Sequence, residues 1–195
     1  MGYDLLNSDV YITHNNGEKV WTLCFNEKMD QFTGFYDYHS PTYIYTKEKL
    51  LTLNPAFRDE LYETHAGEYN IFYGENKLSN IIFIANPEVD HECIFSNLEY
   101  KSVALNANKQ EQRYTWEQVR IYNEFQDSGL RNLDINNLRK LNRKYRLTLP
   151  RNQNSTDRIR NNWAFIELRA LNAQKLFYLN QDIVLHYRPN YIMIR

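Results

Sequence analysis

The chain has 195 residues, a formal net charge of −1 and a pI near 6.5. This length is enough for one large or two small β domains with a buried core. The near-neutral charge argues against a protein that binds nucleic-acid phosphates over its whole surface. Aromatic residues make up 15% of the chain, including sixteen Tyr, and they can supply burial that aliphatic residues usually provide. We therefore expect a folded, aromatic-rich protein.

Charged residues are unevenly distributed along the sequence. Arg131 to Arg160 is rich in Arg and Lys, whereas Asp59 to Glu99 leans acidic. The favoured interpretation is two solvated faces of opposite sign. One alternative is a nucleic-acid site. Another is self-association, in which the basic end of one copy meets the acidic end of a second copy.

The two cysteines, Cys24 and Cys93, lie in apolar runs. This position predicts buried free thiols in a reducing compartment, with a single disulfide as the alternative. No apolar stretch approaches the roughly 20 residues that span a bilayer, so the sequence predicts no membrane-spanning segment.

In the first half, short aromatic and β-branched runs broken by Asn, Pro and Gly predict strands and turns. Lys47 to Leu53 fits a short helix or a strand, which Asn54-Pro55 ends. Leu61 to Gly74 is interpreted as a hairpin, and Asn80 to Ala85 as a strand covered on both faces. The other strands predicted here are Val10–Ile12, Val20–Phe25, Phe32–Tyr38 and Thr42–Thr46.

The stretch from Val20 to Tyr45 has the densest aromatic content. We expect Asn26 and Ser40-Pro41 to set its turns, because Asn and Pro favour turn geometry. The aromatic side chains expected in the core are Phe25, Phe32, Phe35 and Tyr36. Solvent exposure of both Phe32 and Phe35 would contradict this expectation.

In the second half, Arg113 to Phe125 alternates clearly, with Val119 and Ile121 on one face. Asn136 to Tyr145 is open between a helix and an extended basic arm. Trp163 to Leu171 and Lys175 to Tyr187 are predicted as a last strand pair. Glu92–Tyr100, Val103–Asn106 and Tyr145–Leu149 are further strands, and Tyr191–Ile194 adds an apolar segment.

Roughly ten short strands predict an all-β, mainly antiparallel fold. The architecture is a β-sandwich or a propeller-like fragment with at most one or two short helices. Residues 1–195 are expected to form a single β-rich domain. A polar stretch near residues 106–112 marks a candidate sub-domain boundary between 1–107 and 112–195.

No catalytic, cofactor-binding or metal-ligating residue is predicted. The five histidines are scattered, and His91-Glu92-Cys93 lacks a second ligand pair at zinc spacing. Gly67 and Gly74 lack the Lys-Ser/Thr of a phosphate-binding loop. Asp127-Ser128-Gly129 lacks the flanking glycines of a nucleophile elbow. The sequence therefore favours a non-enzymatic protein without a cofactor.

The aromatic side chains have two interpretations. Core packing with cross-strand pairs is favoured. The alternative is that a few, such as Tyr36, Tyr38 or Trp163, are exposed and stack on sugar rings or on another subunit.

Five segments in order resemble a known family: Phe25 to Pro41, His65 to Gly74, Ile81 to Glu88, Val119 to Gly129, and Tyr145 to Arg151. The set resembles the tail structural proteins of crAss-like bacteriophages, of the tail stabilisation or muzzle type. The resemblance lies in the order of the five segments taken together.

The resemblance implies a virion structural module of the phage tail, made in the cytoplasm of the bacterial host. It carries over no catalytic residues, and it implies one excised domain of a longer protein. Its partners would be other tail proteins and copies of itself, with no specific nucleic acid. The alternative function is a carbohydrate-binding module that recognises a host surface glycan.

Overall fold

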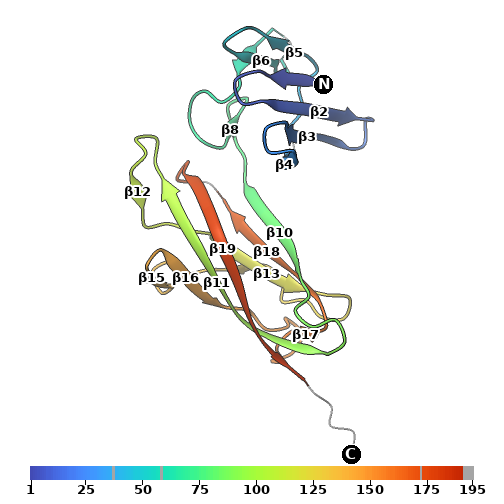
Figure 1. The fold of residues 1–195 in the computed structure, drawn as a ribbon, viewed down its shortest axis with the longest axis vertical. Coiled ribbons are helices and arrows are strands. Elements are labelled where there is room, and N and C mark those ends of the chain that lie inside the picture. Colours follow the sequence, from blue (N-terminus) through green and yellow to red (C-terminus); the bar gives the residue numbers. More distant parts are fainter. Residues whose placement is uncertain (37, 58, 172, 191–195) are drawn as a thin grey trace, which may run out of the picture. The chain divides into compact units, whose positions relative to one another are not determined.

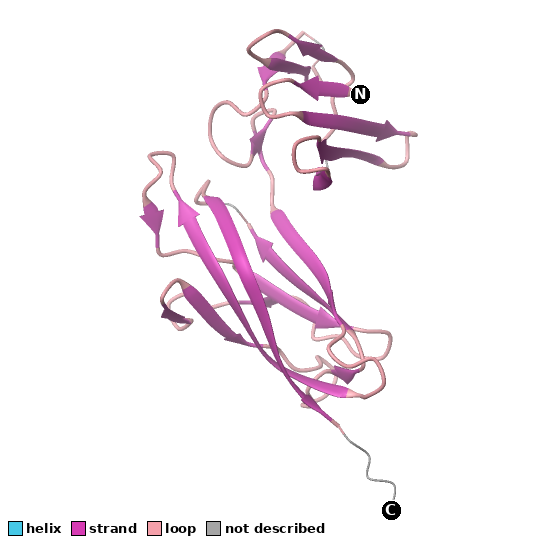
Figure 2. Cartoon of the chain, in the orientation of Figure 1, coloured by secondary structure: helices cyan, strands magenta, loops and turns pink. Residues whose placement is uncertain are grey.

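The computed structural model describes residues 1–36, 38–57, 59–171 and 173–190. Every regular element in this described part is a β-strand, and all strand pairs are antiparallel, so the all-β prediction is confirmed (Figures 1 and 2). The described residues contain no helix able to cross a membrane. Contacts divide the chain into unit 1, Met1–Glu75, and unit 2, Asn76–Arg195.

Unit 1 is built from neighbouring strands that pair in chain order. Its largest sheet has the order β1-β2-β3-β4, and two smaller sheets follow with the orders β5-β6-β7 and β8-β9. The strands are β1 (Gly2–Asp4), β2 (Asp9–Asn15), β3 (Val20–Asn26), β4 (Gln31–Tyr36), β5 (Tyr43–Tyr45), β6 (Leu50–Leu53), β7 (Leu61–Glu63), β8 (Ile71–Phe72) and β9 (Glu75–Asn76).

The core of unit 1 is small and rich in tyrosine. Tyr11, Cys24 and Leu50 are almost fully buried, and Tyr36 and Tyr43 pack against them. The Tyr11 hydroxyl lies 2.8 Å from His65 Nε2, so this buried phenol keeps a polar partner. Burial raises the pKa of Tyr36 to about 12. Tyrosine thus supplies both the apolar contacts and the polar contacts of this core.

Two predictions for unit 1 are settled by strand pairing. Lys47 to Leu53 contains strand β6 and no helix. The hairpin predicted for Leu61 to Gly74 is wrong, because β7 pairs with β6 while β8 pairs with β9. The backbone is left-handed at Asn70 and Tyr73, on either side of β8, so extended structure is interrupted at both positions.

Unit 2 is a β-sandwich of two sheets (Figure 2). One sheet has the order β10-β18-β13-β14. In the other, the long strand β11 pairs with β19 along its length and also with β12, β16 and β17. The strands are β10 (Ser79–Ala85), β11 (Cys93–Leu105), β12 (Glu111–Gln112), β13 (Gln118–Tyr122), β14 (Arg131–Asn132), β15 (Arg139–Leu141), β16 (Lys144–Thr148), β17 (Arg160–Asn161), β18 (Ala164–Ala170) and β19 (Phe177–Pro189).

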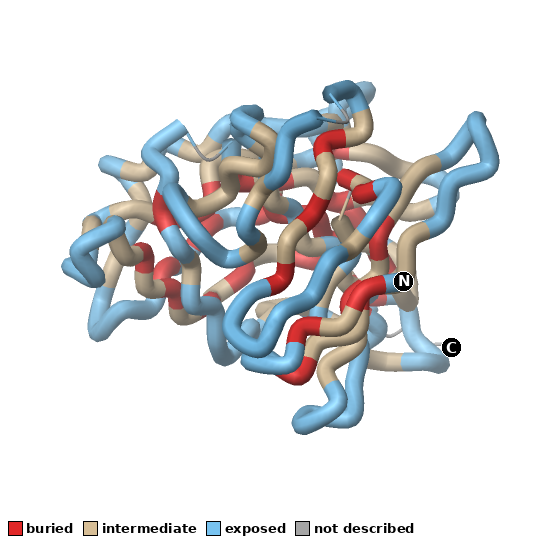
Figure 3. Tube along the Cα trace, turned by 90° about the horizontal axis from the view of Figure 1, so that it is seen from above, coloured by how far each residue is buried: buried red, intermediate tan, exposed pale blue. Residues whose placement is uncertain are grey.

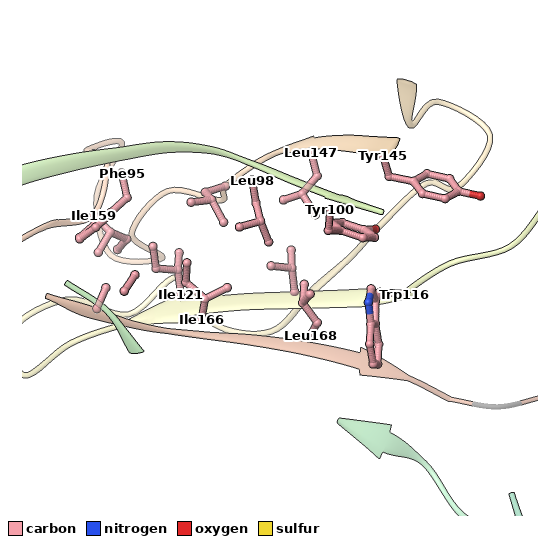
Figure 4. Packing of buried hydrophobic residues seen from close by; sticks show 14 of the residues in the cluster. Phe95, Leu98, Tyr100, Trp116, Ile121, Tyr145, Leu147, Ile159, Ile166 and Leu168 are labelled. Carbon is pink, nitrogen blue, oxygen red and sulfur yellow. The ribbon is translucent and has the colours of Figure 1, made fainter. Parts of the chain in front are cut away.

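The core of unit 2 lies between these sheets. Phe95, Leu98 and Tyr100 of β11 face Ile121 of β13 and Ile166 of β18 (Figure 4). Buried and partly exposed positions alternate along β11, as a two-layer packing requires, whereas Ile166 to Leu168 of β18 are buried without interruption (Figure 3). This cluster holds most of the buried apolar side chains of the chain.

The edge strand β10 differs from its prediction. Ile82 and Ile84 are 49% and 63% exposed, so the expectation of a strand covered on both faces is wrong. β10 pairs only with β18 among the described strands, and its alternate residues Ile81 and Phe83 pack on the core. A continuous apolar run here produces one buried and one exposed face.

Other predictions for unit 2 are also corrected. Trp163 to Leu171 and Lys175 to Tyr187 do not pair, because β18 and β19 belong to different sheets. Asn136 to Tyr145 is neither a helix nor an extended arm. It holds the β15–β16 hairpin, whose turn residues Asn142 and Arg143 have positive φ.

Residues 106–112 form the turn and return strand of the β11–β12 hairpin inside unit 2. Tyr191–Ile194 lies outside the described residues.

Candidate assembly surfaces

The outward side of the largest sheet in unit 1 is apolar. Tyr11 of β2 and Cys24 of β3 point into the core, so the residues that alternate with them point the other way. Register places Ile12 opposite Leu23. We define the aromatic face as the outward residues of β2, β3 and β4: Val10, Ile12, His14, Trp21, Leu23, Phe25, Phe32 and Phe35.

A β-bulge in β4 brings two phenylalanines to this face. Phe32 pairs with Phe25 and Phe35 pairs with Leu23, although the two phenylalanines are three residues apart. In a regular strand that spacing would put them on opposite faces. The register shift adds one residue, Thr33, between them and returns both rings to the same side.

The rings of the aromatic face contact one another across the strands. Trp21 lies 5.0 Å from the His14 ring and 5.2 Å from the Phe35 ring, and Phe25 meets Phe32 edge to face at 5.2 Å. Phe32 and Phe35 are nonetheless 61% and 66% exposed. The expectation that they supply core is therefore wrong.

The other predictions for this stretch have mixed outcomes. Tyr36 does pack on the core cluster, whereas Phe25 is half-buried on the aromatic face. Asn26 Oδ1 accepts a bond from Met29 N, which confirms its role in the turn. Ser40 Oγ donates to the Thr42 carbonyl at 2.6 Å and holds the next turn.

The three aromatic residues proposed as exposed stacking groups are not exposed. Tyr38 is 8% exposed and its ring stacks on Phe72 at 4.5 Å. Tyr36 and Trp163 are half-buried, and Trp163 meets Phe165 edge to face. The aromatic face was missed because its signal is the β4 bulge, which alternation alone does not reveal.

A second surface is a basic groove on the outer side of the β11 sheet in unit 2. The groove has a volume of about 630 Å³. Its floor is the outward side of β11 at Ile94 and Asn97, and its walls come from β16, β17, β19 and the segment between β16 and β17. Its basic side chains are Arg146, Arg151, Arg158, Arg160, His186 and Arg188.

Backbone oxygens hold two of these arginines. Arg158 Nη1 donates to the Ser96 carbonyl at 3.3 Å, and Arg151 Nη1 donates to the Thr156 carbonyl. A carbonyl orients a guanidinium without neutralising its charge, and further N–H donors stay available. Arg146 differs, because Glu99 lies 3.5 Å from it and also 3.2 Å from His186.

The outer side of the β10 sheet carries a charged cluster with a structural role. Glu167 is 2% exposed, and Arg169 Nε donates to its carboxylate at 2.5 Å. Arg120 pairs with Asp127 and lies over the Tyr122 ring. The hydrogen bond from Arg120 holds the pKa of Asp127 below its ordinary value. The carboxylates of Asp127 and Glu167 thus neutralise the guanidinium groups of Arg120 and Arg169.

The described residues contain no group of three or more His, Cys, Asp or Glu arranged to hold a metal ion. Cys24 and Cys93 are free and buried, as predicted. Cys93 Sγ lies 3.7 Å from the His91 carbonyl, and burial raises the pKa of its thiol.

Comparison with known proteins matches two family models. Residues 1–56 match the Crassvirus muzzle protein, and residues 67–152 match the Crassvirus muzzle protein C-terminal domain. The chain is also 33% identical, over 192 residues and 95% of its length, to the muzzle protein of Bacteroides phage crAss001. The chain spans 13% of the length of that relative.

Proposed function

The chain belongs to the crassvirus muzzle protein family, and from that premise we propose that it is a non-enzymatic structural module of the phage tail. It acts through contacts with other virion proteins, including copies of itself. The family membership supports a virion role, and the aromatic face of unit 1 supports the contact mechanism.

The aromatic face carries this proposal. Monomeric soluble proteins seldom expose contiguous apolar patches of this kind, and such patches mark interaction sites. Aromatic residues are also enriched in the buried centres of protein interfaces. Phe32 and Phe35 do not pack into the core of unit 1, and their rings are largely exposed. Burial of these rings against a partner would explain why the sequence places them on the surface.

Photo-crosslinking in particles tests the proposal. In the full-length protein, p-benzoylphenylalanine replaces Phe35, and purified virions are irradiated. The control position is Asn108, an exposed residue in the turn between β11 and β12 of unit 2 that does not line the basic groove. We expect position 35 to form adducts with a virion protein and position 108 to form few. The proposal fails if the protein is absent from purified particles, or if both positions behave alike.

Carbohydrate binding is the second candidate function, supported by the neighbouring Trp21 and Phe35 rings at 5.2 Å. Flat aromatic surfaces with an accessible polar neighbour, here His14, suit the apolar faces of sugar rings. A glycan array compares the wild type with Trp21→Ala. A ligand bound only by the wild type supports this function, and an array without any binder removes it.

A further inference from the structure

The two units carry opposite charge. Residues 1–75 contain five Lys and Arg against twelve Asp and Glu, whereas residues 76–195 contain eighteen against twelve. The formal net charge of −1 is therefore the sum of a negative charge on unit 1 and a positive charge on unit 2. Opposite potentials on separate surfaces steer association and fix its orientation.

The basic groove concentrates the positive charge of unit 2. Five arginines line it together with His186, and the carboxylate among its lining residues is that of Asp157. Within the described residues, the structure records no ion pair to Arg151, Arg158, Arg160 or Arg188. Guanidinium groups bind carboxylates in a two-pronged geometry, so the groove is suited to a carboxylate-bearing chain segment.

Unit 1 presents such a segment before strand β7. Asp59 and Glu60 are exposed, and Leu61 directly after them is 57% exposed. Glu60 accepts a hydrogen bond from Tyr62 at 2.8 Å, which keeps its carboxylate oriented. Ile94 and Tyr187 supply apolar surface in the groove for a side chain such as Leu61. The charges and the apolar contacts of groove and segment are therefore complementary.

We propose that the basic groove of one copy binds the acidic segment at Asp59–Leu61 of a second copy, head to tail. This inference rests on the proposed function and names the partner of unit 2. Each copy would present one groove and one segment, so the contact is heterologous and adds copies in one direction. Such contacts produce rings when the rotation closes.

Sedimentation of the 195-residue chain tests the contact. We expect self-association at about 50 mM salt that weakens on the order of tenfold or more at about 500 mM, because salt screens exposed charges. The groove variant is Arg151→Glu with Arg158→Glu, and the segment variant is Asp59→Lys with Glu60→Lys. Each variant alone should be monomeric. Their equimolar mixture should associate again, because the unmodified groove meets the unmodified segment and the reversed groove meets the reversed segment; this also shows that both variants are folded.

A matched control changes the same charge elsewhere. Lys109→Glu with Arg113→Glu alters two exposed cations of unit 2 that do not line the groove, and it should associate like the wild type. The inference is overturned if the groove variant still associates or if the wild type is monomeric at every salt concentration. It is also overturned if the groove binds heparin or a DNA oligonucleotide while the chain does not self-associate.

The two proposals can fail separately. A monomeric chain whose position 35 still crosslinks in virions overturns the head-to-tail contact and leaves the structural function standing. A salt-sensitive dimer whose parent protein is absent from purified particles overturns the structural function.

Discussion

Replacement of Phe35 by Thr tests whether the aromatic face is surface or core. Full burial of a Phe side chain is worth about 1.5–3 kcal/mol. Phe35 is 66% exposed, so about a third of that gain, ~0.5–1 kcal/mol, is at stake in its folding. Threonine is β-branched and, like phenylalanine, favours a strand. We therefore expect Phe35→Thr to lower the free energy of unfolding of unit 1 by less than about 1 kcal/mol.

Leu50→Ala is the matched control in the same unit. Leu50 is 2% exposed, and truncation of a buried leucine costs about 2–5 kcal/mol. Hydrogen exchange of β2 and β3 peptides at increasing urea concentration reports the opening free energy of unit 1 alone. A loss from Phe35→Thr as large as that from Leu50→Ala would show that Phe35 is buried and would refute the aromatic face.

Three further predictions concern stability. Gly2→Ala should destabilise unit 1 by about 1–3 kcal/mol, because the added Cβ would overlap the Tyr43 ring. Urea unfolding should show a smaller loss in a Tyr43→Ser background, and an equal loss would contradict the clash. Asp127→Asn should reduce the free energy of unfolding that the protein loses on acidification, by less than about 1 kcal/mol. The pKa of Asp127 is lowered in the fold, so its stabilisation is present above about pH 4 and is lost as pH falls through the lower folded value; unchanged acid unfolding midpoints speak against it. Tyr36→Phe should lessen the loss of stability between about pH 10 and pH 12, because the pKa of Tyr36 rises to about 12 in the fold and the unfolded phenol ionises at lower pH. Tyrosinate absorbance checks this, and ionisation of Tyr36 near pH 10 in the folded chain rules it out.

Local patterns predicted most strands, because alternation and turn residues act over a few neighbours. The run around Val119 and Ile121 is an example, since both are buried on one face of β13. The sequence pattern predicted two strands, Glu92–Tyr100 and Val103–Asn106, where the structure has the single strand β11; the polar Lys101-Ser102 separated them. Ser102 is fully buried between Tyr100 and Ala104, so a small polar residue continues the inward face. The polar pair Lys101-Ser102 was therefore predicted as a break, although β11 is continuous there.

Strand partners were not predictable, because pairing depends on contacts that are distant in sequence. The run at Lys175 to Tyr187 pairs with β11 and not with its neighbour β18. The same pairing brings Arg188 opposite Ile94, beside the arginines of residues 131–160. The basic groove therefore could not be assembled from the sequence, although its arginine-rich stretch was visible there.

The β11–β19 pairing also bears on how the chain folds during synthesis. β11 ends at Leu105 and β19 begins at Phe177, so the ribosome must add the whole intervening segment before the two strands can meet. At roughly 5–20 residues per second this delay lasts several seconds. Unit 1 pairs strands that are neighbours in the chain, and such local topologies fold fast. Unit 1 should therefore be folded on the ribosome while β11 still lacks its longest partner, which makes β11 the segment most open to misassociation in the nascent chain.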